Sequence, residues 1–109
     1  MAATKISVII PVWNGEAVLG RCLTALAAQT LPRDAYEVIV VDNGSTDATA
    51  AVARGFAGVR LLSEPAPGSY AARNMAIGVA AAPLIAFTDA DCVPAPDWLG
   101  RALTAASRP

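Results

Sequence analysis

The chain has 109 residues, of which 55% are hydrophobic and 16% charged, and its formal net charge at pH 7 is −1. This length fits one small domain or part of a larger one. A nearly neutral chain without a cluster of lysine and arginine is not expected to bind nucleic acid, and no stretch approaches the roughly 20 apolar residues of a membrane span. The sequence has no histidine, which excludes serine–histidine and cysteine–histidine catalysis and zinc bound by histidine.

The beginning of the chain predicts a strand, a turn and a helix. Residues 6–12 are rich in β-branched side chains, and the Trp-Asn-Gly sequence that follows at 13–15 is a turn signal. Apolar side chains then recur at helical spacing over residues 16–29, and Pro32 ends that helix. We expect Cys22 to be buried in this helix, because the two cysteines of the chain lack the spacing of a metal site.

A second strand is predicted over residues 36–41, which are again rich in β-branched side chains. The helix after it is expected to run to about residue 54, with Ser45 or Thr46 as its cap. Asp47 would then lie in the first turn of the helix, where the helix dipole favours an anion.

The second half of the chain continues the alternation. A short strand over residues 58–62 is followed by a Pro- and Gly-rich loop over residues 64–68. The next helix is expected over residues 69–81, and the free backbone N–H groups at its start can bind a phosphate. A fourth strand follows over residues 84–88. A last helix opens at Asp97, and we expect the Asp97 side chain to cap it.

This alternation predicts an α/β fold with a mostly parallel sheet, right-handed crossovers and helices on both faces. In such a sheet the carboxyl ends of the strands lie along one edge, and ligands bind there. Aromatic or polar side chains follow three of the four predicted strands. They are Trp13 and Asn14 after the first strand, Asp42 and Asn43 after the second, and Asp89 and Asp91 after the fourth.

The fourth strand ends in two carboxylates, Asp89 and Asp91, with only Ala90 between them. Two acids this close repel each other unless a cation or a proton shares their site. A hard divalent ion such as Mg²⁺ or Mn²⁺ is the simplest occupant, because it takes oxygen ligands from carboxylates and substrate phosphates. The alternative is a polar strand end at which Asp89 or Asp91 caps the following turn. Cys92, beside the acids, can also touch this site.

Other side chains near this edge have both a functional and a structural interpretation. Asp42 can accept hydrogen bonds from a ribose hydroxyl or a base, or it can form an Asx turn with Gly44. Trp13 can present a flat face to a base, or it can belong to the core. Arg73 can pair with a base carbonyl or a phosphate, or with a surface acid such as Glu64. Together with the acids, these side chains predict a site for a nucleoside diphosphate held by a metal ion.

Four segments of the chain then carry a resemblance to a known family. They are Ser7–Asn14 (SVIIPVWN), Val40–Asp47 (VVDNGSTD), Ala72–Asn74 (ARN) and Phe87–Asp91 (FTDAD). In this order they resemble the successive motifs of the family 2 glycosyltransferases, and the resemblance covers residues 6 to about 99. It implies a Rossmann-like GT-A fold with the strand order 3-2-1-4. It also implies that residues 1–109 are the N-terminal, donor-binding part of a longer GT-A domain, with no second domain.

The family transfers a sugar from a nucleotide-diphosphate sugar to an acceptor hydroxyl, assisted by a metal ion and normally with inversion. The resemblance assigns the metal, Mg²⁺ or Mn²⁺, to Asp89 and Asp91, with Asp91 favoured as the direct ligand. The family's general base is an acid of a later motif, so we expect it beyond Pro109 and expect no sugar transfer by these residues alone. Nucleotide-sugar binding is assigned to Pro11, Val12, Trp13, Asn14, Asp42, Asn43, Arg73, Asp89 and Ala90.

Two other functions remain open at this point. A non-catalytic module could retain the nucleotide-sugar pocket, and a phosphatase of the haloacid dehalogenase type also carries two aspartates one residue apart after a strand. A dinucleotide-binding dehydrogenase is disfavoured, because no G-x-G-x-x-G follows the first strand. The resemblance leaves open the sugar, the base and the acceptor, whether a glycan or a lipid-linked molecule. It implies a cytoplasmic location, with longer family members often acting at the inner face of a membrane.

Overall fold

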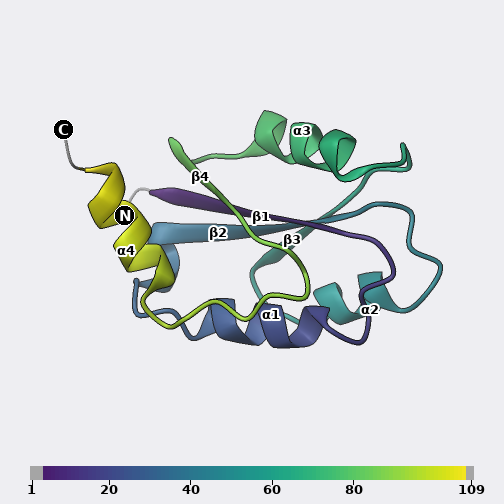
Figure 1. Cartoon of the computed structure of the whole chain (residues 1–109), viewed down its shortest axis with the longest axis horizontal. Helices are drawn as coiled ribbons and strands as arrows, with labels where there is room; N and C mark the ends of the chain where they lie inside the picture. Colours follow the sequence, from purple (N-terminus) through teal and green to yellow (C-terminus); the bar gives the residue numbers. More distant parts are fainter. Residues whose placement is uncertain (1–3, 108–109) are drawn as a thin grey trace.

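The computed structural model describes residues 4–107 and has an α/β fold in which strands and helices alternate along the chain (Figure 1). Its elements are β1 (Ile6–Val12), α1 (Leu19–Ala27), the short 3₁₀ helix η1 (Arg33–Ala35), β2 (Tyr36–Asp42), α2 (Thr49–Arg54), β3 (Val59–Ser63), α3 (Ser69–Val79), β4 (Leu84–Phe87) and α4 (Trp98–Ala106). The strands all run parallel in the order β3-β2-β1-β4. The predicted fold class and strand order are therefore confirmed.

Strand β1 lies inside the sheet, between β2 and β4. On the β2 side, the register runs from Ile6 opposite Tyr36 to Val12 opposite Asp42. Inner strands of a parallel sheet are covered on both faces and therefore need continuous apolar runs. The β-branched run of β1 meets this need. Because the strands are parallel, their carboxyl ends share one edge, where the chain enters the loops after Val12, Asp42 and Phe87.

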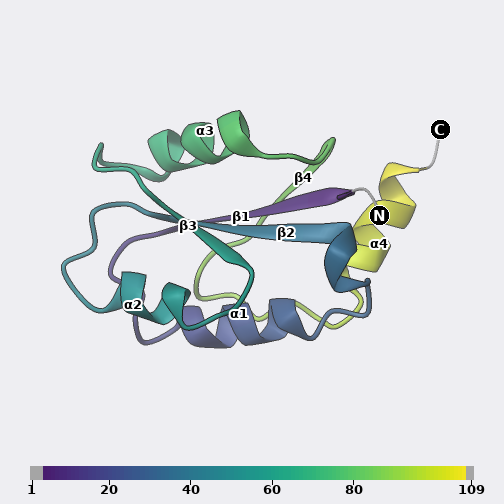
Figure 2. The ribbon, with the colours of Figure 1, turned by 180° about the vertical axis from the view of Figure 1, so that it is seen from behind.

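Helices cover both faces of the sheet, with α1 and α2 on one face and α3 on the other (Figures 1 and 2). Successive side chains of a strand point to opposite faces. Val8 accordingly packs in the larger core with Leu23 of α1, whereas Ile9 packs in a smaller core with Ala72 and Ala76 of α3. The alanines let α3 approach the sheet closely, directly beside the edge where the strands end.

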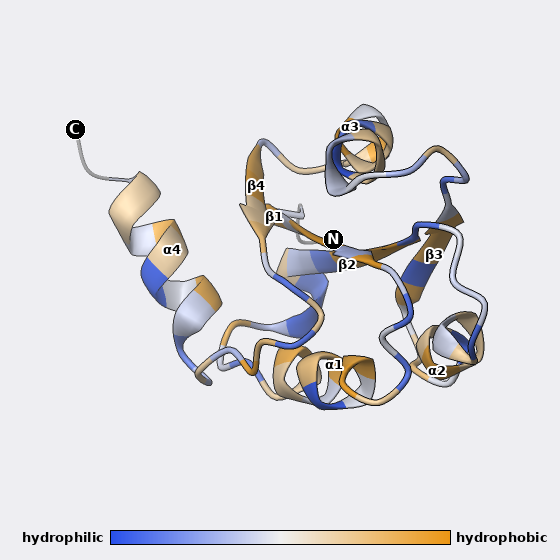
Figure 3. Ribbon diagram, turned by 45° about the vertical axis from the view of Figure 1, so that its right-hand side comes forward, coloured by the Kyte–Doolittle hydropathy of each residue, from blue (hydrophilic) through white to orange (hydrophobic). Residues whose placement is uncertain are grey.

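Helix α4 lies at the side of the sheet, away from α3, and hydrophobic residues run along β1 and β4 in the same view (Figure 3). Leu99 of α4 is buried in the same core as α1. Gln29, after α1, holds the start of α4. Its Oε1 accepts a hydrogen bond from Leu99 N at 3.0 Å, and its Nε2 donates to Ala95 O at 2.7 Å. Within residues 4–107, none of the helices is long and apolar enough to cross a membrane.

Helices α1 and α2 both begin about three residues later than predicted. Residues 16–18 form a turn instead, in which Val18 N and Leu19 N donate to Gly15 O at 3.0 and 2.9 Å. Helix α2 begins at Thr49, so the predicted cap by Ser45 or Thr46 is wrong. Asp47 precedes the helix rather than lying in its first turn. In both places, hydrogen bonds between loops replace the helical ones.

Two further predictions, the end of α3 and the cap of α4, are wrong, whereas the predicted burial of Cys22 is confirmed. Helix α3 ends at Val79, before the predicted residue 81. Asp97 makes no side-chain cap of α4, because its carboxylate turns to Arg101 one turn along, with an Nε–Oδ2 distance of 3.4 Å. Cys22 is fully buried in α1, as predicted.

Candidate functional site

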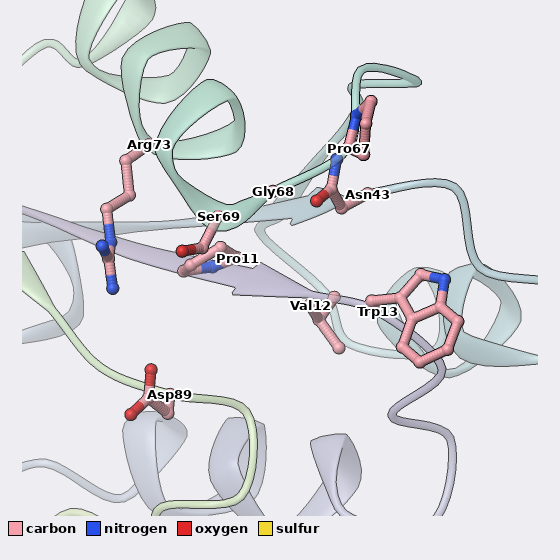
Figure 4. Close-up of a pocket in the computed structure, with 9 residues that line it drawn as sticks. All are labelled: Pro11, Val12, Trp13, Asn43, Pro67, Gly68, Ser69, Arg73 and Asp89. Carbon is pink, nitrogen blue, oxygen red and sulfur yellow. The ribbon is translucent and has the colours of Figure 1, made fainter.

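A cavity of about 530 Å³ opens at the carboxyl edge of the sheet, beside the end of β1 and the start of α3 (Figure 4). Here the chain leaves β1 toward β2 on one side, while β4 pairs on the other, so the cavity lies at the topological switch point of the sheet. Such points are where α/β sheets bind ligands. The lining residues are Pro11, Val12, Trp13, Asn43, Pro67, Gly68, Ser69, Arg73 and Asp89.

Trp13 belongs to the rim of this cavity and not to the core. Its side chain is 66% exposed, whereas Val12 before it is 5% exposed. The end of β1 therefore separates the two side chains, with Val12 in the core and Trp13 at the cavity mouth. The core interpretation of Trp13 is wrong. A largely exposed indole presents a wide flat surface on which a planar ring can stack.

Arg73 extends from α3 across the cavity toward Asp89 (Figure 4). Its guanidinium carbon lies 5.6 Å from the centre of the Phe87 ring. Its Nε is buried and finds no hydrogen-bond partner within residues 4–107. The alternative pairing with Glu64 is not formed, since the ion pair found within the described residues joins Arg101 and Asp97. A buried donor without a partner is uncommon in folded proteins and fits a site that is completed by an anionic ligand.

Asp89, Asp91 and Cys92 form a cluster after β4. One ligand atom from each lies within 4.8 Å of the others, and all three side chains are exposed. Ligands about 2.1–2.4 Å from one ion lie at most about 4–5 Å apart, so these groups can share a single divalent cation. Carboxylate oxygens suit Mg²⁺ or Mn²⁺. The turn itself closes through the backbone, with Cys92 N donating to Asp89 O at 3.0 Å, so neither carboxylate is needed as its cap.

Three residues assigned to nucleotide-sugar binding are not among those that line the cavity. Ala90 is buried in the core under the loop after β1. The predicted Asx turn of Asp42 with Gly44 is wrong, because the Asp42 carboxylate accepts instead from Ser45 N, three residues on, at 3.0 Å. Asn14 adopts a left-handed conformation (φ 49°) and accepts from Thr46 N through its Oδ1 at 2.8 Å. These side chains fix the loops that carry the lining residues.

The loops after β1 and β2 are joined by hydrogen bonds that the sequence did not predict. Gly15 N donates to Thr49 Oγ1 at 2.9 Å, and Glu16 N donates to Asp47 Oδ2 at 3.3 Å. The Asp47 carboxylate also accepts from the backbone N–H and the hydroxyl of Thr49. The hydroxyl contributes most to lowering the pKa of Asp47 below its ordinary value, and the backbone donors add to it against the effect of burial. The loop that carries Trp13 is thus held on the loop that carries Asn43.

Two more features of the site were not predicted from the residue types in the sequence. Pro67 forms part of the cavity wall, although it stood out in the sequence only as a member of a Pro- and Gly-rich loop. Cys22, in the core, donates through Sγ to Asp89 O at 3.7 Å and so supports the turn of the acids from below. Burial, followed by the charges of Cys92 and the two acids, raises the pKa of Cys22 to about 11. Cys22 therefore stays a thiol.

Comparisons with known proteins agree with this geometry. The family model "Glycosyl transferase family 2" matches residues 7–109. The glycosyltransferase AglE of Haloferax volcanii is 43% identical over 107 residues, which cover 94% of this chain and 35% of that protein. The poly(ribitol-phosphate) beta-glucosyltransferase of Bacillus spizizenii is 37% identical, covering 88% of this chain and 15% of that protein. This chain therefore spans about a third or less of these relatives.

A solved structure superposes on the whole chain. It is a mannosyltransferase from Pyrobaculum calidifontis in complex with GDP-Man and Mn²⁺, 32% identical with a TM-score of 0.91, and the match covers 100% of this chain and 34% of that one. TarS 1-349 of S. aureus in complex with UDP-GlcNAc is 30% identical with a TM-score of 0.84, covering 93% of this chain and 30% of that one. The resemblance of the sequence motifs is confirmed. The chain belongs to glycosyl transferase family 2 and has the Rossmann-like GT-A fold of that family.

Proposed function

We propose that this chain is the donor-binding part of an enzyme that transfers a sugar from a nucleoside-diphosphate sugar to an acceptor hydroxyl, with inversion and with a divalent metal ion. The observation that carries this proposal is the cavity at the end of β1. One site there brings together an exposed indole, an arginine with an unpartnered donor and a carboxylate of the acid cluster. The GDP-Man and UDP-GlcNAc complexes of the two structural neighbours support a nucleotide-sugar donor.

The cavity offers separate surfaces for the parts of such a donor. Pro11, Val12 and Trp13 form an apolar wall that suits the base and ribose. Asn14 ties the loop after this wall to the loop after β2, and Asp42 accepts from Ser45 N within that second loop. The backbone N–H groups at the start of α3 suit a phosphate group, because the first N–H groups of a helix have no partner within it. Arg73 supplies a permanent positive charge on the same side.

The acids at the end of β4 suit the metal ion. Asp89 lines the cavity, and Asp91 stands within reach of the same cation. When bound, a divalent ion stabilises the negative charge that develops on the departing diphosphate. Ala90 contributes its buried side chain to the core, which fixes the backbone between the acids. The complexes of two neighbours with Mn²⁺ support a divalent ion of this kind.

Inversion also needs a base that takes the proton of the acceptor hydroxyl. Among the described residues, the acids at the cavity are those proposed to hold the metal, so we place the base outside residues 1–109. Sugar transfer is then a property of a longer protein. A phosphatase of the haloacid dehalogenase type receives no support, because the chain belongs to a glycosyltransferase family.

Incubation of the chain with labelled UDP-GlcNAc or GDP-mannose and Mn²⁺ tests whether these residues bind the donor without transferring its sugar. We expect equilibrium dialysis to show binding of at least one donor, and chromatography to show no transfer to an added glycan or lipid-linked acceptor. Transfer by these residues alone would contradict the placement of the base. Binding of neither donor would contradict the proposed donor site.

A further inference from the structure

Asn43 is the first residue after β2 and stands between two walls of the cavity. Its backbone N–H donates to Val12 O at 2.8 Å, which ties it to the end of β1. Its side-chain Nδ2 donates to Glu64 O at 2.7 Å and to Ala66 O at 2.6 Å. Figure 4 shows Asn43 beside Pro67, across the cavity from Asp89. A primary amide has two N–H donors, so both are used within the chain.

The loop that receives these hydrogen bonds (residues 64–68, called the wall loop below) has few other attachments. Glu64 N donates to Asp42 O at 2.9 Å, and Ala66 N donates to the Glu64 side chain of the same loop. Pro65 and Pro67 have no N–H to donate. All residues of the loop after Glu64 are exposed, so no core packing holds them. The Asn43 amide therefore supplies the main link between the wall loop and the sheet.

We propose that Asn43 is a positioning residue for the donor. It holds the wall loop against the end of β2 and thereby sets the distance of Pro67, Gly68 and Ser69 from the opposite wall. Nucleotide affinity then depends on Asn43 through this loop and not through contacts of its amide N–H groups with the base. This inference rests on the proposed donor site, because it concerns how that site keeps its shape.

The variant Asn43→Asp tests the role with almost no change in volume. It replaces the amide donors by carboxylate oxygens that face two carbonyl oxygens, so the wall loop should leave its place. We expect the affinity for UDP and GDP to fall at least about tenfold, which corresponds to roughly 1.4 kcal/mol. Amide deuterium exchange at Glu64 and Ala66, whose N–H groups donate hydrogen bonds in the wall loop, should rise in the absence of any ligand. Asn74→Asp is the matched control, since Asn74 is exposed on α3 and lies outside the cavity wall.

A new negative charge near a diphosphate weakens binding by itself, so two measurements separate that effect from the loop. Asn43→Ala removes the donors without adding charge, and the uncharged nucleosides uridine and guanosine cannot be repelled. We expect Asn43→Ala to raise exchange in the wall loop and to lower the affinity for both nucleosides and diphosphates. Each affinity is referred to the folded fraction, which urea unfolding of each variant provides.

Two results would overturn the role of Asn43. One is a wall loop that exchanges faster in Asn43→Ala while nucleotide affinity stays unchanged, and the other is exchange that does not change at all. Failure of the unmodified chain to bind any nucleotide is a different outcome and contradicts the proposed function. The exchange measurement needs no nucleotide, so the two failures can be told apart.

Discussion

The side-chain oxygen of Asn14 accepts a hydrogen bond from the backbone N–H of Thr46 at 2.8 Å, across 32 residues of sequence. Asn14 N in turn donates to Ser45 Oγ at 2.8 Å. This pair of contacts fastens the loop after β1 to the loop after β2 at the residue that follows the exposed Trp13. Asn14 suits this place because asparagine tolerates its left-handed backbone (φ 49°) better than most residues.

Two substitutions of Asn14 separate the hydrogen bond from the backbone conformation. Asn14→Gly keeps the left-handed conformation and loses the side-chain oxygen, so the free energy of unfolding should fall by about 1 kcal/mol. Asn14→Ala loses the oxygen and strains the backbone as well, so the fall should be about 2–3 kcal/mol. Urea unfolding of the chain measures both. Equal values for the two variants would show that the backbone conformation costs nothing.

The lowered pKa of Asp47 predicts a dependence of stability on acidity. A carboxyl whose pKa is lower in the folded state stabilises the fold fully above its unfolded value, about 3.9, and this stabilisation is lost as the pH falls through the lower folded value. The difference in unfolding free energy between the unmodified chain and Asp47→Asn should therefore be constant from neutral pH to about 5 and should shrink below about pH 4.

Urea unfolding at several pH values between neutral and about 3 measures this difference. Asp34→Asn is the control, because Asp34 is exposed in η1 and accepts no hydrogen bond from the described residues. A difference for Asp47→Asn that stays constant down to the lowest pH would show that the ionised carboxylate does not hold the two loops together.

The two cysteines should differ strongly in reactivity. Cys22 is fully buried and has a pKa of about 11, so little thiolate forms and reagents cannot reach it. Cys92 is exposed in the acid cluster. We expect iodoacetamide to label Cys92 alone in the folded chain, and Mn²⁺ to slow this labelling. Mass spectrometry of the labelled chain gives both results. Labelling of Cys22 at a rate similar to that of Cys92 would contradict the burial of Cys22 in the core.

Arg73→Met tests the guanidinium group, whose Nε finds no hydrogen-bond partner in the described part of the chain. Methionine keeps an apolar stem beside Phe87 and removes the charge and the buried Nε. We expect the affinity for a nucleoside diphosphate to fall by about 1.5–3 kcal/mol, because a hydrogen bond to a charged group is lost, while the free energy of unfolding is unchanged or higher. Arg54→Met, at the exposed end of α2, is the control and should leave the affinity unchanged. A similar loss in both variants would point to general charge attraction instead of a specific contact.

The strands and the acid cluster could be predicted from the sequence because each depends on local patterns. The β-branched run at Ile6–Val12 specifies a buried strand, and the apolar run before Asp89 specifies a strand that is half-buried, with Phe87 exposed. Parallel topology then brings the ends of the two strands together. The starts of α1 and α2 could not be predicted in this way. Residues around Asn14 and Asp47 make hydrogen bonds to a loop some 30 residues away, and these bonds outcompete helical ones.

The candidate site, too, could be predicted only where it depends on local sequence patterns. The wide exposure of Trp13 and the unpartnered Nε of Arg73 depend on which residues pack around them, so the sequence left two interpretations of each open. The place of Pro67 in the cavity wall depends on the Asn43 amide, whose partners lie more than 20 residues along the chain. Such a contact cannot be predicted from the spacing of residues along the sequence.

Metal-dependent nucleotide binding tests the central claim most directly. Isothermal titration of GDP and UDP, with and without Mn²⁺, is compared for the unmodified chain, Asp91→Asn and Asp97→Asn. Asp97 is the matched control, because it is an exposed acid that pairs only with Arg101 in the part of the chain that the structure describes. We predict that Mn²⁺ tightens nucleotide binding in the unmodified chain and in Asp97→Asn, and that this effect disappears in Asp91→Asn. An undiminished effect of Mn²⁺ in Asp91→Asn would contradict the account.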